Sequence, residues 1–237
     1  MATFLVAHGA WSAGFAWKKM RGRLRELGHE LITPTYTGLG ERHHLARPEV
    51  DLETHIADVL GVLHCEDLRD VILVGHSYGG MVATGVADRV PDRLAQIVYL
   101  DAFVPRSGQS LLDLVPQPPG GPPDPRVEPW RVPPNPLPPD TSPADVAWIM
   151  PRRFPQPRRS FEQRLTLAGA GSAVPRTYIY CTRPGPGDVF RQFADRARVE
   201  PGWGYLEIDA THNPHLTAPD ALGALLGAIA AKGVAGR

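Results

Sequence analysis

The sequence predicts an α/β protein built on a mostly parallel, doubly wound sheet of about six strands. Short, wholly apolar runs alternate with amphipathic helical patterns along most of the 237 residues. A single proline-rich stretch interrupts this alternation once. Apolar strands of this kind belong to parallel sheets that helices cover on both faces. Ligands of such sheets bind beyond the carboxyl ends of the strands, so reactive residues are expected just after strands.

The expected elements follow one another in the order strand, helix, strand. The strands are expected at residues 3–7, 31–33, 71–74, 97–100, 177–181 and 205–208. The helices are expected at residues 15–27, 52–63, 81–89, 189–197 and 220–230, where apolar residues recur three or four positions apart. Pro34 and Pro91 end the elements before them, because proline lacks the N–H donor that either structure needs.

Twelve of the 26 prolines lie between Pro116 and Pro139. This stretch is predicted to be extended and irregular. We therefore expect residues 105–171 to form a cap over the strand ends, and residues 1–104 and 172–237 to form the core. The apolar residues of the cap either line a substrate pocket or form the cap's own core; they are Trp130, Trp148, Ile149, Met150 and Phe154.

Composition excludes several classes of function. Lys and Arg number 25, as do Asp and Glu, so the basic excess of a nucleic-acid-binding protein is absent. No apolar run approaches the roughly 18 residues of a membrane span, and the N-terminus does not resemble a signal peptide. The sequence thus predicts a cytoplasmic protein with neither a nucleic-acid nor a membrane partner.

The cysteines and a histidine cluster suggest no further site. Cys65 and Cys181 are expected to be free, buried thiols. His43, His44 and His55 lack the spacing of metal ligands and are expected in a solvated loop. Neither a metal nor an organic cofactor is predicted.

The residues Gly75-His76-Ser77-Tyr78-Gly79-Gly80 lie between a predicted strand and a predicted helix. G-x-S-x-G in this context predicts a sharp turn that presents the serine above the sheet. The glycines leave room where side chains would collide with neighbouring backbone. Ser77 is therefore the candidate nucleophile, and His76 is expected to be a packed structural histidine.

The residues His8-Gly9-Ala10-Trp11 follow the first strand. Two backbone N–H groups can stabilise the negative oxygen of a tetrahedral intermediate. The N–H groups of Ala10 and Tyr78 are the candidates, and Trp11 is expected to contact the substrate.

A serine nucleophile needs a base of near-neutral pKa. His212 follows the last strand, where the base of such a protein is expected. His215 lies about a turn further on, where packing or the start of a helix explains it better.

Two aspartates can serve as the acid that orients this histidine. Asp101 ends the strand at 97–100, a position that favours it. Asp188 precedes the helix at 189–197 and resembles its N-cap. Asp209 is a weaker third candidate, because it is close to His212 in sequence.

These motifs together resemble the α/β-hydrolase superfamily, and within it the esterase and hydroxynitrile-lyase branch that includes plant methyl-ester esterases. The resemblance rests on residues 8–11, residues 75–80, and His212 followed seven residues later by Pro219. It implies an eight-stranded fold trimmed at its start, with the cap inserted after the strand that ends at Leu100.

The sequence departs from that branch at several positions. Thr211 stands where the plant proteins have aspartate before the histidine, and Pro184 stands where they carry the catalytic acid. Other α/β-hydrolases take the acid from the preceding strand, which favours Asp101. Hydroxynitrile lyases carry a lysine at the position of Asn213 and a threonine at that of Gly9, so both positions resemble esterases.

The predicted function is hydrolysis of a carboxylic ester of a small-to-medium apolar substrate through an acyl-enzyme. A lyase or C–C bond hydrolase with the same residues is one alternative. A ligand-binding protein that keeps the fold without turnover is another. The only partner predicted is the small-molecule ester.

Overall fold

The computed structural model describes residues 1–185 and 187–235 and contains a sheet of six parallel strands. The sheet order is β2-β1-β3-β4-β7-β8, and each neighbouring pair is parallel. The predicted number and direction of the strands are confirmed. The strands are β1 (Thr3–Ala7), β2 (Glu30–Ile32), β3 (Val71–His76), β4 (Leu94–Leu100), β7 (Arg176–Cys181) and β8 (Trp203–Ile208).

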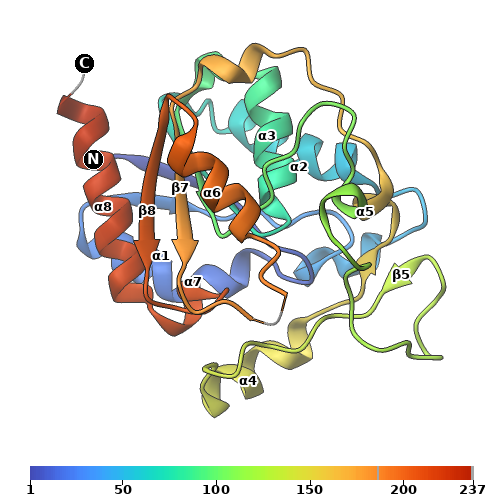
Figure 1. Ribbon diagram of the computed structural model, residues 1–237. Coiled ribbons are helices and arrows are strands. Elements are labelled where there is room, and N and C mark those ends of the chain that lie inside the picture. Colours follow the sequence, from blue (N-terminus) through green and yellow to red (C-terminus); the bar gives the residue numbers. More distant parts are fainter. Residues whose placement is uncertain (186, 236–237) are drawn as a thin grey trace.

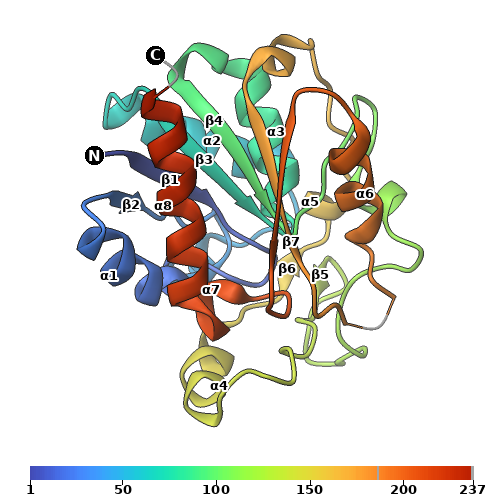
Figure 2. The same cartoon turned by 60° about the vertical axis from the view of Figure 1, so that its left-hand side comes forward.

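Helices cover both faces of the sheet. α1 (Lys18–Glu26) and α8 (Pro219–Ala235) contact each other on one face, as Figure 2 shows. The other face carries α2 (Leu52–Cys65), α3 (Gly79–Arg89) and α6 (Arg191–Val199). Successive strand residues point to opposite faces. In β1, Phe4 and Val6 therefore pack in the core with α1 and α8, whereas Leu5 and Ala7 pack in the core with α2 and α3.

The first helix is shorter than predicted. A 3-10 turn (Gly14–Trp17) precedes α1, and α1 ends at Glu26. Leu27, the last residue of the expected helix, is 40% exposed because it lies beyond the last helical turn. Outside residues 105–171, the other 3-10 turns of the described chain are Gly40–Leu45 and Pro91–Arg93.

Part of the chain between β4 and β7 lies beyond the carboxyl ends of the strands, as α4 below the arrowheads of β7 and β8 shows in Figure 1. It contains short elements separated by irregular chain. Residues 116–139, which the structure describes in full, contain no regular element other than the two-residue strand β5. The short elements are β5 (Arg131–Val132), α4 (Pro143–Ile149), β6 (Gln156–Pro157) and α5 (Arg159–Glu162), with 3-10 turns at Leu111–Leu114, Met150–Arg152 and Ala170–Ala173.

Two expectations about burial are wrong. Cys65 is exposed, because it ends α2 on the side away from the buried Leu63. His55 is fully buried and not in a solvated loop, because it lies on the inner face of α2. Its Nδ1 is 2.8 Å from the hydroxyl of Tyr78, and its Nε2 is 3.1 Å from the carbonyl oxygen of Thr37.

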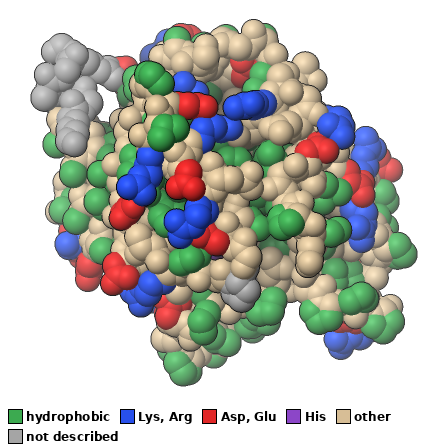
Figure 3. All heavy atoms as spheres, viewed as in Figure 1, with side chains coloured by type: hydrophobic (Ala, Val, Ile, Leu, Met, Phe, Trp, Pro, Cys, Tyr) green, Lys and Arg blue, Asp and Glu red, His purple; other side chains and the backbone are tan. Residues whose placement is uncertain are grey.

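Positive and negative side chains are intermingled on the face that Figure 3 shows, as the balanced composition predicts. Within residues 1–185 and 187–235, no helix is long and apolar enough to cross a bilayer. The same residues contain no group of three or more His, Cys, Asp or Glu side chains that could hold a metal ion.

Candidate active site

A cavity of about 960 Å³ lies at the carboxyl ends of the strands. Both the sheet and the chain between β4 and β7 line it. Six non-glycine residues of the described chain have positive φ, a strained conformation, and four of them line this cavity. These four are Trp11, Ser77, Asp101 and Asp188. All six residues predicted for the site also line it: Ala10, Trp11, Ser77, Tyr78, Asp101 and His212.

Ser77 lies in the sharp turn between β3 and α3, with φ of +56°. A Cβ on Gly79 would lie 1.9 Å from the carbonyl oxygen of Ala7, and one on Gly80 would lie 2.0 Å from that of Phe103. Only glycine fits at either position. The turn is therefore wedged between β1 and the segment after β4, which fixes Ser77 at the edge of the cavity.

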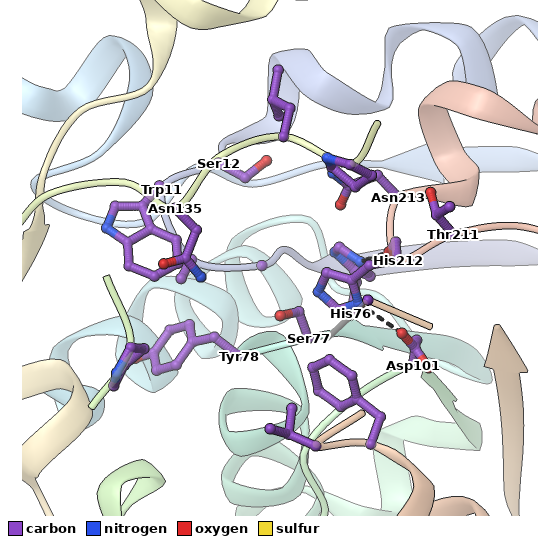
Figure 4. Close-up of a pocket in the computed structure, with 18 of the residues that line it drawn as sticks. Trp11, Ser12, His76, Ser77, Tyr78, Asp101, Asn135, Thr211, His212 and Asn213 are labelled. Atoms are coloured by element: carbon purple, nitrogen blue, oxygen red, sulfur yellow. Dashed lines mark hydrogen bonds and ion pairs between the residues drawn. The ribbon is translucent and has the colours of Figure 1, made fainter. Parts of the chain in front are cut away.

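His212 and Asp101 form a hydrogen-bonded pair beside Ser77 (Figure 4). The distance from Nδ1 of His212 to Oδ2 of Asp101 is 2.7 Å. Asp101 is only 4% exposed, and its other carboxylate oxygen accepts the N–H of Cys181 at 3.3 Å. This arrangement fixes the orientation of the imidazole. Within the described residues no hydrogen bond joins the hydroxyl of Ser77 to His212 (Figure 4); catalytic hydrogen bonds are often long in a protein without substrate.

The other acid candidates have different partners. Oδ2 of Asp188 accepts hydrogen bonds from the hydroxyl of Tyr180 at 2.7 Å and from Arg191 at 2.9 Å. The prediction that Asp188 caps the helix is wrong, because left-handed backbone at Gly187 and Asp188 delays the start of α6 and the N-cap is Phe190.

Asp209 lies at the surface, where its carboxylate pairs with Arg183 at 2.9 Å. His215 is buried in the short helix α7 (Pro214–Thr217) and stacks on Trp17 with ring centroids 4.7 Å apart. The packing role expected for His215 agrees with this position.

The loop after β1 is held by the buried side chain of His8. Nε2 of His8 accepts the N–H of Tyr36 at 3.2 Å, so the ring proton is on Nδ1, which donates to the carbonyl oxygen of Gly9 at 2.8 Å. The C=O and N–H of one peptide point in opposite directions, so this bond fixes the direction of the Ala10 N–H. Among the described residues, none accepts a hydrogen bond from the backbone N–H of Ala10 or of Tyr78, so both remain available.

Gln156 supports the loop after β1, a role that the sequence did not indicate. Its fully buried side chain comes from β6, and its Oε1 accepts the N–H of Trp11 at 3.0 Å. Its amide group donates to the hydroxyl of Ser160 at 2.9 Å. The indole of Trp11 donates to the carbonyl oxygen of Val132 at 2.8 Å. Two side-chain hydrogen bonds thus fix the loop after β1 to the β5–β6 pair.

We expect Gln156→Leu to lower both stability and turnover. Leucine has a similar size but leaves the buried N–H of Trp11 without an acceptor, which costs about 1–3 kcal/mol of unfolding free energy. Displacement of the neighbouring Ala10 N–H should lower kcat roughly tenfold to a hundredfold. Urea unfolding and steady-state kinetics test both effects. Gln192→Leu, at an exposed position, is the control; equal effects of the two substitutions would contradict the prediction.

Two aromatic rings hold His212 in place. Phe190 stacks on the His212 ring with centroids 4.6 Å apart and planes 12° apart. His76 is the last residue of β3, and its ring centroid lies 4.8 Å from that of His212. Its Nε2 is 2.8 Å from the carbonyl oxygen of His212. His76 is buried, which agrees with the expected structural role. Neither contact could be predicted from sequence spacing.

Four histidines at or near the site are buried, and desolvation outweighs every other influence on their pKa values. Burial lowers the pKa of His8 and His215 to about 3 and that of His55 to about 4. Burial also holds the pKa of His76 well below its usual value. All four side chains are therefore neutral at pH 7.

These shifts predict acid instability. Below pH 6.5 the unfolded chain protonates these histidines while the folded protein does not, so stability falls as pH falls from about 6.5 towards 4. Each histidine contributes up to about 1.4 kcal/mol per pH unit to this slope. The free energy of unfolding should be measured in urea between pH 7 and pH 4.5. His215→Phe keeps the stack on Trp17 and should flatten the slope, whereas the exposed His44→Gln should not; identical slopes would refute this explanation.

Five apolar residues were expected either to line a pocket or to form the cap's own core, and of these only Ile149 lines the cavity. Trp148 packs against Phe15, and Phe154 stacks on His43. Met150 is 45% exposed. The pocket-lining alternative thus holds for Ile149 alone, because the rings of Trp148 and Phe154 pack against residues of the core segment instead.

The fold and the arrangement of Ser77, His212 and Asp101 are those of an α/β hydrolase, and the chain belongs to the alpha/beta hydrolase family, whose sequence pattern matches residues 4–225. A carbendazim hydrolyzing esterase from Nocardioides sp. (strain SG-4G) is 42% identical, over 97% of this chain and 100% of that protein. These similarities identify an esterase-type hydrolase.

More distant relatives include plant proteins. Salicylic acid-binding protein 2 from Nicotiana tabacum is 31% identical over 108 residues, which cover 44% of this chain and 40% of the tobacco protein. The aligned residues thus cover less than half of either protein. A solved extracellular alpha/beta-hydrolase from a Paenibacillus species superposes with a TM-score of 0.78 at 26% identity, over 95% of this chain and 98% of that one.

Proposed function

We propose that the protein is a serine esterase that hydrolyses carboxylic esters through a covalent acyl-enzyme. The observation that carries the proposal is the 2.7 Å pair between His212 and Asp101 beside Ser77 in its strained turn. A nucleophile, a base and an acid in this arrangement perform acyl transfer.

In the first half of the reaction, Oγ of Ser77 attacks the ester carbonyl carbon and its proton passes to Nε2 of His212. The carbonyl oxygen becomes negative and is stabilised by the N–H groups of Ala10 and Tyr78. The carbon–oxygen bond to the alcohol then breaks, and the alcohol leaves with the proton from His212. Asp101 keeps Nδ1 of His212 protonated throughout and stabilises the imidazolium.

In the second half, water attacks the acyl carbon after giving a proton to His212. The bond to Ser77 breaks, the acid leaves, and the serine oxygen recovers its proton. No step needs a metal or organic cofactor. This sequence uses only groups that line one cavity.

Carbamate esters are a second substrate class for the same chemistry. The relative at 42% identity over nearly the whole chain is a carbendazim hydrolyzing esterase, which favours testing them. Attack by Ser77 would give a carbamoyl-enzyme, and water would release a carbamic acid that loses CO₂. A lyase reaction is less favoured, because Asn213 follows the histidine where the resembling lyases carry lysine.

The test is hydrolysis of p-nitrophenyl acetate, butyrate and octanoate and of methyl N-phenylcarbamate. We expect turnover of the p-nitrophenyl esters, and a fluorophosphonate probe should add its phosphonyl mass to the peptide that contains Ser77. The preferred chain length would measure the reach of the cavity. Absence of both turnover and labelling would favour a ligand-binding protein with this fold.

A further inference from the structure

Arg153 is a cation without an anionic partner in the wall of the cavity. It follows the 3-10 turn after α4 and lines the cavity with a partly buried side chain. Within the described chain its contacts are one hydrogen bond to the carbonyl oxygen of Asn135 and a position 6.0 Å from the ring centre of Trp11. Burial lowers the pKa of Arg153 to about 10, so it is charged at neutral pH.

Among the described residues, the other Asp and Arg side chains of the cavity wall already have partners. Asp101 pairs with His212, and Asp188 binds Arg191. Arg183 pairs with Asp209. Neither carboxylate of the described wall therefore compensates Arg153. A buried cation without a partner is costly, so it is retained where something else supplies the negative charge.

Arg153 contacts residues on the side of Ser77 where the acyl half of the substrate is expected. His212 donates its proton to the leaving alcohol, so the alcohol must lie on the side of His212. Trp11 and Asn135, the two residues that Arg153 contacts, lie on the other side of Ser77 from the His212–Asp101 pair (Figure 4). The acyl group would extend from Ser77 towards them.

We propose that Arg153 binds a carboxylate at the far end of the acyl group, so that the preferred substrates are half-esters of dicarboxylic acids. The inference rests on the ester hydrolysis proposed for Ser77. A guanidinium presents parallel N–H donors that match a carboxylate, and one contact to Asn135 leaves others free. The cavity wall is rich in apolar side chains, which suits the hydrocarbon part of such an acyl chain; they include Phe15, Leu111, Ile149 and Phe161.

The experiment compares kcat/KM for methyl esters that differ only at the far end of the acyl chain. Monomethyl adipate, suberate and sebacate carry the carboxylate. Chains of the same length that end in a carboxamide or a methyl group are the neutral counterparts. We expect the best carboxylate ester to exceed both neutral counterparts by about tenfold or more, because a hydrogen-bonded ion pair in a partly buried site is stronger than a neutral hydrogen bond.

Arg153→Met should abolish this preference, which is read as a ratio within one variant so that losses of folded protein cancel. Arg152→Met is the matched control. Arg152 also contacts a backbone carbonyl oxygen and a tryptophan ring, those of Trp148, but it is exposed and does not line the cavity. Its substitution should leave the ratio unchanged.

Three results would overturn the proposal. The unaltered protein could prefer the neutral esters, or it could hydrolyse the carboxamide-ended esters at the same kcat/KM as the carboxylate-ended ones. The third is an unchanged ratio in Arg153→Met. Failure of the esterase assignment is recognised separately, by the absence of turnover with every ester. Calorimetric titration of suberate into Ser77→Ala and into Ser77→Ala/Arg153→Met then decides. Binding only with Arg153 present supports the carboxylate site without hydrolysis, and its absence in both variants refutes it.

Discussion

Replacement of Ser77 by alanine is expected to lower kcat for p-nitrophenyl butyrate by about 10⁴-fold or more. The substitution removes the only atom proposed to bond to the acyl group. The remaining N–H donors and binding contacts can supply only a small residual rate over water. Stopped-flow and steady-state release of p-nitrophenol measure the loss.

Two controls give that result its meaning. Ser172→Ala, at an exposed position outside the cavity, should retain normal turnover. The urea unfolding curve of Ser77→Ala should match or exceed that of the unaltered protein, since φ of +56° at residue 77 strains both side chains alike. Substantial turnover by a folded Ser77→Ala would exclude the acyl-enzyme route.

Asp101→Asn is expected to lower kcat by about 10⁴-fold while Asp188→Asn changes it little. The side-chain amide of asparagine can donate a hydrogen bond to Nδ1 of His212. The ring proton of His212 then lies on Nε2, which can no longer accept the serine proton. Asp188 instead binds Tyr180 and Arg191, so its substitution should cost stability of about 1 kcal/mol.

The comparison is read from kcat over pH 5 to pH 9 and from urea unfolding of both variants. In Asp101→Asn the loss should be in kcat and not in KM, because the carboxylate contacts the base and not the substrate. A larger catalytic loss in Asp188→Asn would assign the acid to the segment after β7 and exclude the present assignment.

The fold was predictable because its signals are local. Six apolar strand patterns gave six parallel strands, and the expected ends differ from the observed ones by only a few residues. β4 begins at Leu94 and not at residue 97, because backbone pairing with β3 continues through residues of mixed polarity. The interrupted alternation placed the proline-rich segment correctly between β4 and β7.

The positions of Ser77, Ala10 and Tyr78 were also predictable. The serine turn needs glycines at fixed spacing, since a Cβ there would collide with backbone of β1 and of the segment after β4. All of these glycines lie within residues 75–80, so the sequence alone indicates the turn. A histidine after the last strand follows from the same order of elements.

The tertiary structure alone decided the contacts between residues far apart in sequence. The sequence favoured Asp101 by its position at a strand end but left Asp188 as an alternative, and the hydrogen bond across 111 residues is what places Asp101 against His212. The contact of Gln156 with Trp11 spans 145 residues, and no spacing rule reports it.

Burial and charge compensation were likewise invisible in the sequence. His55 was expected in a solvated loop but is buried. Nothing in the sequence distinguished Arg153 from the other Lys and Arg residues, which number 25 in all. Periodicity and glycine spacing reflect the geometry of one segment of backbone. Desolvation and pairing depend on which segments the fold brings together. For this protein the sequence indicated the class of chemistry, whereas only the tertiary structure placed Asp101 against His212 and Arg153 in the cavity wall, because both placements depend on segments far apart in sequence.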